Sequence, residues 1–115
     1  MNNQEIDICK FCLDHGQKMW KAEKEVYAQE KLIYFYKNEK QRYEEKEFEY
    51  FHEEHLFNPI EHGMSLLEYT RHYSGLVEAC DYRIDELKEE LKEKENKYIN
   101  AKREFIYHIS NTHPK

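Results

Sequence analysis

Apolar side chains recur at intervals of three, four or seven residues through the second half of the chain, from Leu66 to Phe105. They are Leu66, Tyr73, Val77, Cys80, Ile84, Leu87, Leu91, Tyr98, Ala101 and Phe105. This heptad spacing places one apolar stripe along a helix and is typical of a coiled coil. Ser65 followed by Glu68 forms a capping box, which satisfies backbone N–H groups of the first helical turn. The pattern therefore predicts a long helix over residues 65–110.

The first half of the chain carries a second, less regular heptad stripe. Its members are Met19, Ala22, Val26, Gln29, Ile33, Tyr36, Lys40, Tyr43, Glu47, Tyr50 and Phe57. The stripe predicts a second long helix over residues 17–57, preceded by a short helix over residues 1–16. We interpret Gly16 as a joint between them, because a glycine inside a helix costs about 1 kcal/mol relative to alanine. A neighbouring stripe of aromatic residues widens the apolar face and consists of Trp20, Tyr27, Tyr34 and Phe48.

A loop over residues 58–64 is predicted between the two long helices. Asn58 and Pro59 end the first helix, because the residue before a proline avoids the helical region and proline donates no backbone hydrogen bond. Short connections make neighbouring helices antiparallel, and residues whose numbers sum to about 123, such as Ile33 and Leu91, then face each other. The sequence thus predicts an all-α fold: a long antiparallel two-helix hairpin (coiled coil) with a short N-terminal helix, in one domain.

The composition also favours a coiled coil over a compact globular core. Charged residues make up 37% of the 115 residues, and the mean hydropathy is −1.11. Two long helices bury one stripe each and enclose no cavity that shelters a reaction from water, so we expect neither an enzyme nor a bound cofactor. The net charge of −6 disfavours nucleic acid and anionic lipid as partners.

Three features of the sequence predict a cytoplasmic protein. The longest apolar run, Leu32–Tyr36, is too short to insert into a membrane. The first residues, Met1–Glu5, lack the basic and apolar regions of a signal peptide. The three cysteines, an odd number, fit a reducing compartment better than a disulfide framework.

Cysteine and histidine residues near both ends of the chain are the candidate metal ligands. Cys9, Cys12 and His15 have a spacing that zinc sites use, and the antiparallel register brings His108 to the same end. Two thiolates and two imidazoles would complete a tetrahedral clasp. The alternative, which we favour, is that Cys12 and His15 belong to the buried stripe and that the chain holds no metal.

Histidines and glutamates gather around the predicted turn. Glu49-x-x-His52 is similar to the Glu-x-x-His pair of di-iron bundles, but such sites need ligands from four helices and this chain offers two. We therefore interpret the turn as a solvated acidic tip.

Aromatic residues are unusually frequent, with ten tyrosines and six phenylalanines. Several lie off the core stripes, and exposed aromatics on a helical rod typically mark a contact surface. We assign Tyr34 and Tyr69 to a partner-binding face, together with Glu53 and Glu54 of the acidic tip. A dimer of hairpins is a further way to cover the second aromatic stripe.

Parts of both helices resemble the FliJ/YscO family, the coiled-coil stalk proteins of flagellar and type III secretion export. The resemblance covers about half of the chain, within residues 29–105, and includes Gly63 in the loop. Its motifs are Leu32-Ile33-x-x-Tyr36-x-Asn38-Glu39 and Tyr73-x-x-Leu76-Val77-x-x-Cys80-x-x-x-Ile84. It implies a rod that enters the pore of a hexameric export ATPase and contacts the membrane export gate. The gate-contacting face would fall on Gln29, Ile33, Tyr36, Leu76 and Cys80, although our heptad assignment places all of these except Leu76 in the hairpin core.

The sequence therefore predicts a non-enzymatic coiled-coil adaptor that binds other proteins, in the form of an export stalk if the resemblance holds. A small acidic inhibitor, of the kind that mobile elements encode, is the first alternative; it would block a basic surface of a larger enzyme. A metal-binding helical dimer is the second alternative.

Overall fold

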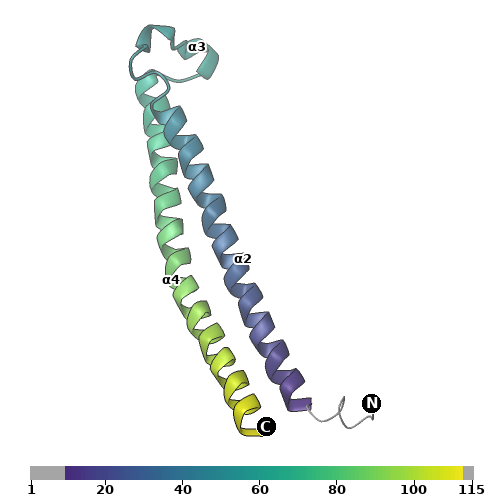
Figure 1. The fold of residues 1–115 in the computed structure, drawn as a ribbon. Helices are drawn as coiled ribbons and strands as arrows, with labels where there is room; N and C mark the ends of the chain where they lie inside the picture. The colour runs from purple at the N-terminus through teal and green to yellow at the C-terminus, as the bar shows by residue number, and fades with distance from the viewer. Residues whose placement is uncertain (1–9, 113–115) are drawn as a thin grey trace. The chain divides into compact units, whose positions relative to one another are not determined.

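The structure, a computed structural model, describes residues 10–112, which form helices and turns and no strand. The elements are α2 (Lys10–Glu47), the 3-10 helix η1 (Glu54–Leu56), α3 (Pro59–His62) and α4 (Leu66–Thr112). The chain divides into a terminal unit, residues 10–30 and 89–112, and a loop unit, residues 31–88. Helices α2 and α4 run antiparallel within each unit (Figure 1). The predicted all-α helical hairpin is confirmed.

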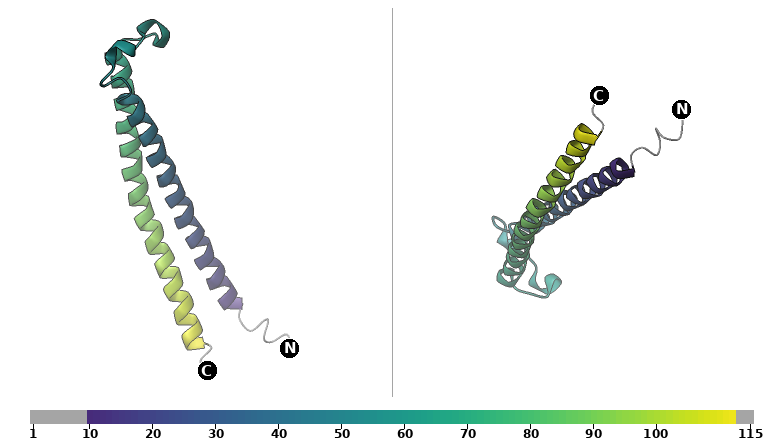
Figure 2. Two further views of the ribbon diagram at one scale, coloured as in Figure 1. Left: turned by 45° about the horizontal axis from the view of Figure 1, so that its top comes forward. Right: turned by 90° about the horizontal axis from the view of Figure 1, so that it is seen from below.

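In the loop unit, the core follows the predicted stripes. Ile33 of α2 and Cys80, Ile84 and Leu87 of α4 are buried, and Leu87 is only 1% exposed. The polar interruption at Lys40 has a partner across the helix pair, because its Nζ lies 2.6 Å from Asp81 Oδ1. This contact raises the pKa of Lys40. The views in Figure 2 agree that α2 and α4 lie side by side in this unit.

In the terminal unit, the most deeply buried residues are small or polar, and the larger apolar residues of the two stripes are half-buried: Met19, Val26, Leu91, Tyr98 and Phe105. Ala22 and Ala101 are buried at 3% exposure, and Gln29 is buried at 4%. The Gln29 amide donates to Glu90 Oε2 at 3.0 Å and accepts from Lys94 Nζ at 2.9 Å, so both of its polar atoms are satisfied. A buried amide is stable here because α4 supplies one acceptor and one donor.

Gly16 does not separate two helices, and the predicted helix boundary at residue 16 is wrong. Helix α2 begins at Lys10 within the described residues and continues through Gly16. A Cβ placed at Gly16 would lie 3.5 Å from Phe105 Cε2, so the glycine sits directly beneath an aromatic ring of α4. The part of the predicted helix over residues 1–9 lies outside the described residues.

The connection between the long helices is larger than predicted. Helix α2 ends at Glu47 instead of Phe57, and residues 48–53 form successive turns. Asn58 and Pro59 start a helix instead of stopping one: Asn58 Oδ1 accepts from Ile60 N at 3.0 Å and caps α3, and Pro59 occupies its first turn. Proline suits that position because the first N–H groups of a helix have no partner within it.

Helices α3 and α4 have well-defined ends. Gly63 ends α3 with φ of 67°, the left-handed conformation that glycine adopts without steric cost. Ser65 Oγ then accepts from Glu68 N at 3.1 Å, which confirms the predicted cap of the second long helix.

The predicted antiparallel register is confirmed separately in each unit. In the terminal unit, Lys18 Nζ lies 3.4 Å from Glu104 Oε2, and the rings of His15 and His108 are 5.2 Å apart. In the loop unit, Lys40 pairs with Asp81. Each of these pairs lies within one helical turn of the pairing that a symmetric loop requires.

Candidate functional site

An aromatic cluster fills the space inside the connection of the loop unit. Its members come from the turn after α2, from the segment before α3, from α3 and from α4: Tyr50, Phe57, His62, Tyr69 and Tyr73. Phe57 stacks on His62 at 4.8 Å with an interplanar angle of 6°, and Tyr69 meets Tyr50, Phe57, His62 and Tyr73 at centroid distances of 4.9 to 5.7 Å. Phe57 and Tyr69 are buried. This aromatic cluster holds the connecting segment against the first turns of α4, where Tyr73 also lies 6.2 Å from Tyr43 of α2.

The Tyr69 hydroxyl anchors the cluster to the turn that follows α2. It donates to Glu49 Oε2 at 2.6 Å, and Glu49 also lies 3.8 Å from Lys46 Nζ. Burial, followed by the hydrogen bond to Glu49, raises the pKa of Tyr69 above its ordinary value near 10.0. The hydroxyl is therefore neutral, and a donor, at physiological pH.

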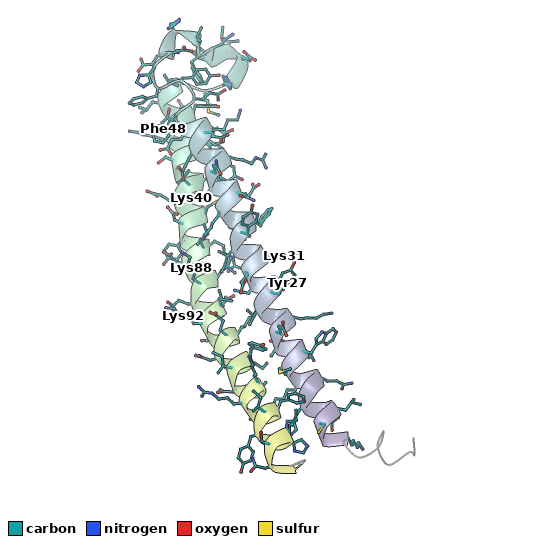
Figure 3. All side chains as sticks on the ribbon, viewed as in Figure 1. Tyr27, Lys31, Lys40, Phe48, Lys88 and Lys92 are labelled. Atoms are coloured by element: carbon teal, nitrogen blue, oxygen red, sulfur yellow. The ribbon has the colours of Figure 1, made fainter. Side chains whose placement is uncertain are left out.

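A groove of about 430 Å³ opens beside the aromatic cluster, between the end of α2 and the first turns of α4. We call it the loop groove; its lining is Glu47, Phe48, Tyr50, Phe51, Glu54, Leu66, Leu67 and Thr70. Phe48, Phe51 and Leu67 are exposed at 58%, 66% and 58%, and the rings of Phe48 and Phe51 meet edge to face at 6.2 Å. Figure 3 labels Phe48 beside the connecting segment. Its size and largely apolar lining match those of sites that take an apolar group of a ligand or partner.

Acidic side chains border the apolar part of the loop groove. Glu47 and Glu54 belong to its lining, and Glu53 is exposed beside Glu54. The only charged side chains in the lining are these two carboxylates. The lining of the groove therefore combines apolar side chains with two carboxylates and contains no basic residue.

The residues predicted to bind partners occupy different environments in the structure. Four of them are buried in the helix pair: Gln29, Ile33, Tyr69 and Cys80. Tyr36 and Leu76 are half-buried, and Tyr34, Glu53 and Glu54 are exposed. The buried four present no surface to a partner while the helices are paired. Tyr69 in particular, which we expected to be exposed, is the centre of the aromatic cluster.

Phe48 and Leu67 were not among the predicted partner-binding residues, and Phe51 was predicted only as one of the aromatic residues that lie off the core stripes. Each directly follows a position of a core stripe, as Phe48 follows Glu47 and Phe51 follows Tyr50. An apolar residue next to a core position widens the apolar face of a helix. This widening is the sequence signal that could have identified the three residues. Their gathering around one groove depends on the turns after Glu47, and the sequence did not predict those turns.

The candidate zinc ligands are only partly brought together. His15 and His108 lie side by side and help to line a cavity of about 410 Å³ with Arg103, Glu104 and Tyr107. Cys12 is half-buried in α2, close to the start of the described residues. Cys9 lies outside the described residues.

The other histidines within residues 10–112 do not form a metal site either. There, no three histidine, cysteine, aspartate or glutamate side chains converge on a point that suits a metal ion. His62 belongs to the aromatic cluster, where its Nε2 lies 3.4 Å from the Tyr50 hydroxyl.

Comparisons with known proteins found no match for this chain. No protein-family model, curated protein or solved structure matches the chain. Between residues 10 and 112, none of the helices combines the length and the apolar character needed to cross a bilayer.

Proposed function

We infer that this chain is a non-enzymatic protein-binding hairpin, and that the loop groove receives an apolar side chain from a basic segment of a partner protein. The observation that supports this function most directly is the exposure of Phe48, Phe51 and Leu67 around one groove. Exposed apolar side chains that gather around one groove, beside polar residues, are typical of interaction sites.

The chemistry of the groove suggests the character of the partner. Aromatic side chains supply a large contact area at a low cost in conformational entropy, and they dominate the binding energy of many interfaces. Glu47 and Glu54 lie beside that contact area, and the chain has a net charge of −6. A segment with one large apolar residue flanked by lysine or arginine fits both features, because its charges steer the encounter and its apolar residue fills the groove.

A selection from random displayed peptides tests this function without knowledge of the natural partner. The full chain serves as bait, and the selected peptides are measured against the double variant Phe48→Ser, Phe51→Ser and against Tyr34→Ser. Tyr34 is an equally exposed aromatic of the same unit that lies outside the groove lining. We expect enriched peptides to carry a large apolar residue next to basic residues and to bind the groove variant at least about tenfold more weakly, a loss of about 1.4 kcal/mol.

Three outcomes of this selection would contradict the proposal. They are no enrichment over an empty bait, enrichment of acidic peptides, and peptides that bind the groove variant as tightly as the parent chain. Loss of binding in Tyr34→Ser alone would instead support the partner contact that the sequence predicted at Tyr34.

The export stalk and the acidic inhibitor are two forms of this proposed function, and they differ in the effect on the partner. A stalk of the FliJ/YscO kind would stimulate a hexameric export ATPase, whereas an inhibitor would reduce the activity of its target. Of the gate-contacting positions that the resemblance implies, Gln29, Ile33 and Cys80 are buried here. A stalk would therefore have to use a different surface, and the loop groove is the one we propose.

A further inference from the structure

The two broad faces of the terminal unit differ in chemistry. On one face, residues that directly precede core positions form ion pairs between the helices: Lys18 with Glu104 at 3.4 Å, and Glu25 with Lys97 at 3.8 Å. In an antiparallel helix pair, positions on the same side of the two core stripes share one face. Residues that directly follow core positions must therefore share the opposite face.

That opposite face of the terminal unit is apolar. We call it the apolar face, and its residues are Leu13, Trp20 and Tyr27 of α2 and Ile99, Ile106 and Ile109 of α4. Their side chains are 39% to 65% exposed. Figure 3 shows Tyr27 projecting from α2 on the side away from α4. Large apolar side chains are thus exposed on both helices, although Lys24 Nζ lies 3.9 Å from the centroid of the Trp20 ring. The ion-paired face is mostly polar and carries one exposed aromatic residue, Tyr107.

The spacing of these residues suits another pair of helices. Leu13, Trp20 and Tyr27 are seven residues apart, as are Ile99 and Ile106. A seven-residue repeat keeps side chains in line along a gently supercoiled helix, which is the pattern that packs against a second helix of the same period. The apolar face is therefore matched to a helical partner that follows it lengthwise.

Charges on the apolar face favour a second copy of this chain as that partner. On α2, the exposed charged residues that directly follow core positions are both acidic, Glu23 and Glu30. On α4, the exposed charged residues that directly follow core positions are two lysines and one glutamate: Lys92, Lys102 and Glu95. A two-fold axis parallel to the helices would lay α2 of one copy over α4 of the other. In the hairpin's own register, Glu30 then faces Lys92, Glu23 lies within about one turn of Lys102, and Leu13 faces Ile109.

The area of the apolar face is sufficient for a specific dimer. Residues 10–30 span about 30 Å as a helix, and two packed helices are about 20 Å wide. Each copy would therefore contribute about 600 Å², or about 1,200 Å² in total, which is the lower bound of stable, specific interfaces. We propose that the chain forms a homodimer through the apolar face of its terminal unit, which completes a four-helix bundle.

Sedimentation equilibrium of the full chain tests the dimer and the surface together. We expect a species of twice the 14.3 kDa chain mass. Trp20→Glu should weaken the dimer by at least about 100-fold, because it places a charge where an indole is buried. Tyr107→Glu is the matched control: Tyr107 is an exposed aromatic of the same unit, but it lies with Glu104 around the cavity on the ion-paired side. Circular dichroism verifies that both variants remain helical.

A charge exchange gives a second, independent readout. Glu30→Lys and Lys92→Glu should each weaken the dimer, and the two changes in one chain should restore it, because every contact across the two-fold axis is then reversed as a pair. A chain that stays monomeric at about 100 μM overturns the proposal, since even a weak specific dimer would then be populated. A dimer that Trp20→Glu leaves intact but Phe51→Ser dissolves also overturns it, and would place the contact at the loop groove.

Discussion

The loop unit and the terminal unit differ in the side chains that they bury most deeply. In the loop unit, Tyr50, Phe57, His62 and Tyr69 fill the space around an irregular connection. In the terminal unit, the most deeply buried positions are two alanines and one glutamine. Small core residues bury little apolar area, so the hydrophobic stabilisation within one chain comes chiefly from the loop unit. Both units expose large apolar residues, but in the terminal unit no large side chain is buried as deeply as Leu87 or Tyr69 of the loop unit.

The largest effect expected from this comparison follows the removal of an aromatic ring from the loop unit. Phe57→Ala should reduce the free energy of unfolding by about 3 kcal/mol, because it leaves a cavity among Tyr50, His62 and Tyr69. Urea unfolding at fixed protein concentration measures the change. The control is Phe51→Ala, whose ring is 66% exposed and whose loss should cost less than about 0.5 kcal/mol. Equal losses in the two variants would show that the aromatic cluster contributes no special stability.

A smaller effect is expected when only the hydroxyl of the aromatic cluster is removed. Tyr69→Phe should cost about 1 kcal/mol at neutral pH, since Glu49 is partly exposed and can bind water in place of the hydroxyl. Because the pKa of Tyr69 is raised in the folded chain, the folded chain keeps the hydroxyl proton above about pH 10, whereas the unfolded chain releases it. The free energy of unfolding therefore falls as the pH rises through this range. The variant should therefore lose less stability than the parent between pH 9 and pH 11. Parallel alkaline profiles for the two proteins would contradict this assignment.

The smallest effect concerns the terminal unit and has the opposite sign. Gly16→Ala should raise the free energy of unfolding by about 0.5 to 1 kcal/mol, because alanine favours the helix and its Cβ would contact Phe105 at ordinary van der Waals distance. Gly75→Ala is the matched control in α4, where an added Cβ meets nothing within 4 Å. In thermal and urea unfolding, the gain in stability from Gly16→Ala should equal or exceed the gain from Gly75→Ala. A loss at Gly16 would mean that the Phe105 ring cannot accommodate a methyl group.

The long helices and their core stripes could be predicted because burial in a helix pair follows a fixed period. Ile33, Leu87 and Ala101 were assigned to the core from spacing alone, and all three are buried. The same rule explains the polar exceptions: Gln29 and Lys40 occupy core positions and find partners on α4. Gln29 is buried at its heptad position although it is polar, whereas Lys40 remains half-buried at its own.

The connection and the loop groove could not be predicted for a related reason. Asn58 and Pro59 can either stop a preceding helix or begin a new one, and the two outcomes require the same residues. Once α2 ends at Glu47, residues 48–57 turn back, and Phe57 enters the aromatic cluster instead of continuing a helical stripe. The burial of Tyr69 and the exposure of Phe51 both depend on that path, which no short-range pattern specifies.

The tightly capped connection also sets the order in which the helices can pair. The contact between Tyr50 and His62 closes a loop of 12 residues, whereas the pair Lys18 and Glu104 joins positions 86 residues apart. Because closure entropy grows with the logarithm of loop length, forming the distant pair first would cost about 1.7 kcal/mol more. Each pair formed near Gly63 shortens the loop that the next pair must close, so the hairpin assembles as a zipper from its connected end. Loop-closure entropy therefore disfavours pairing of the terminal unit before the loop unit has formed.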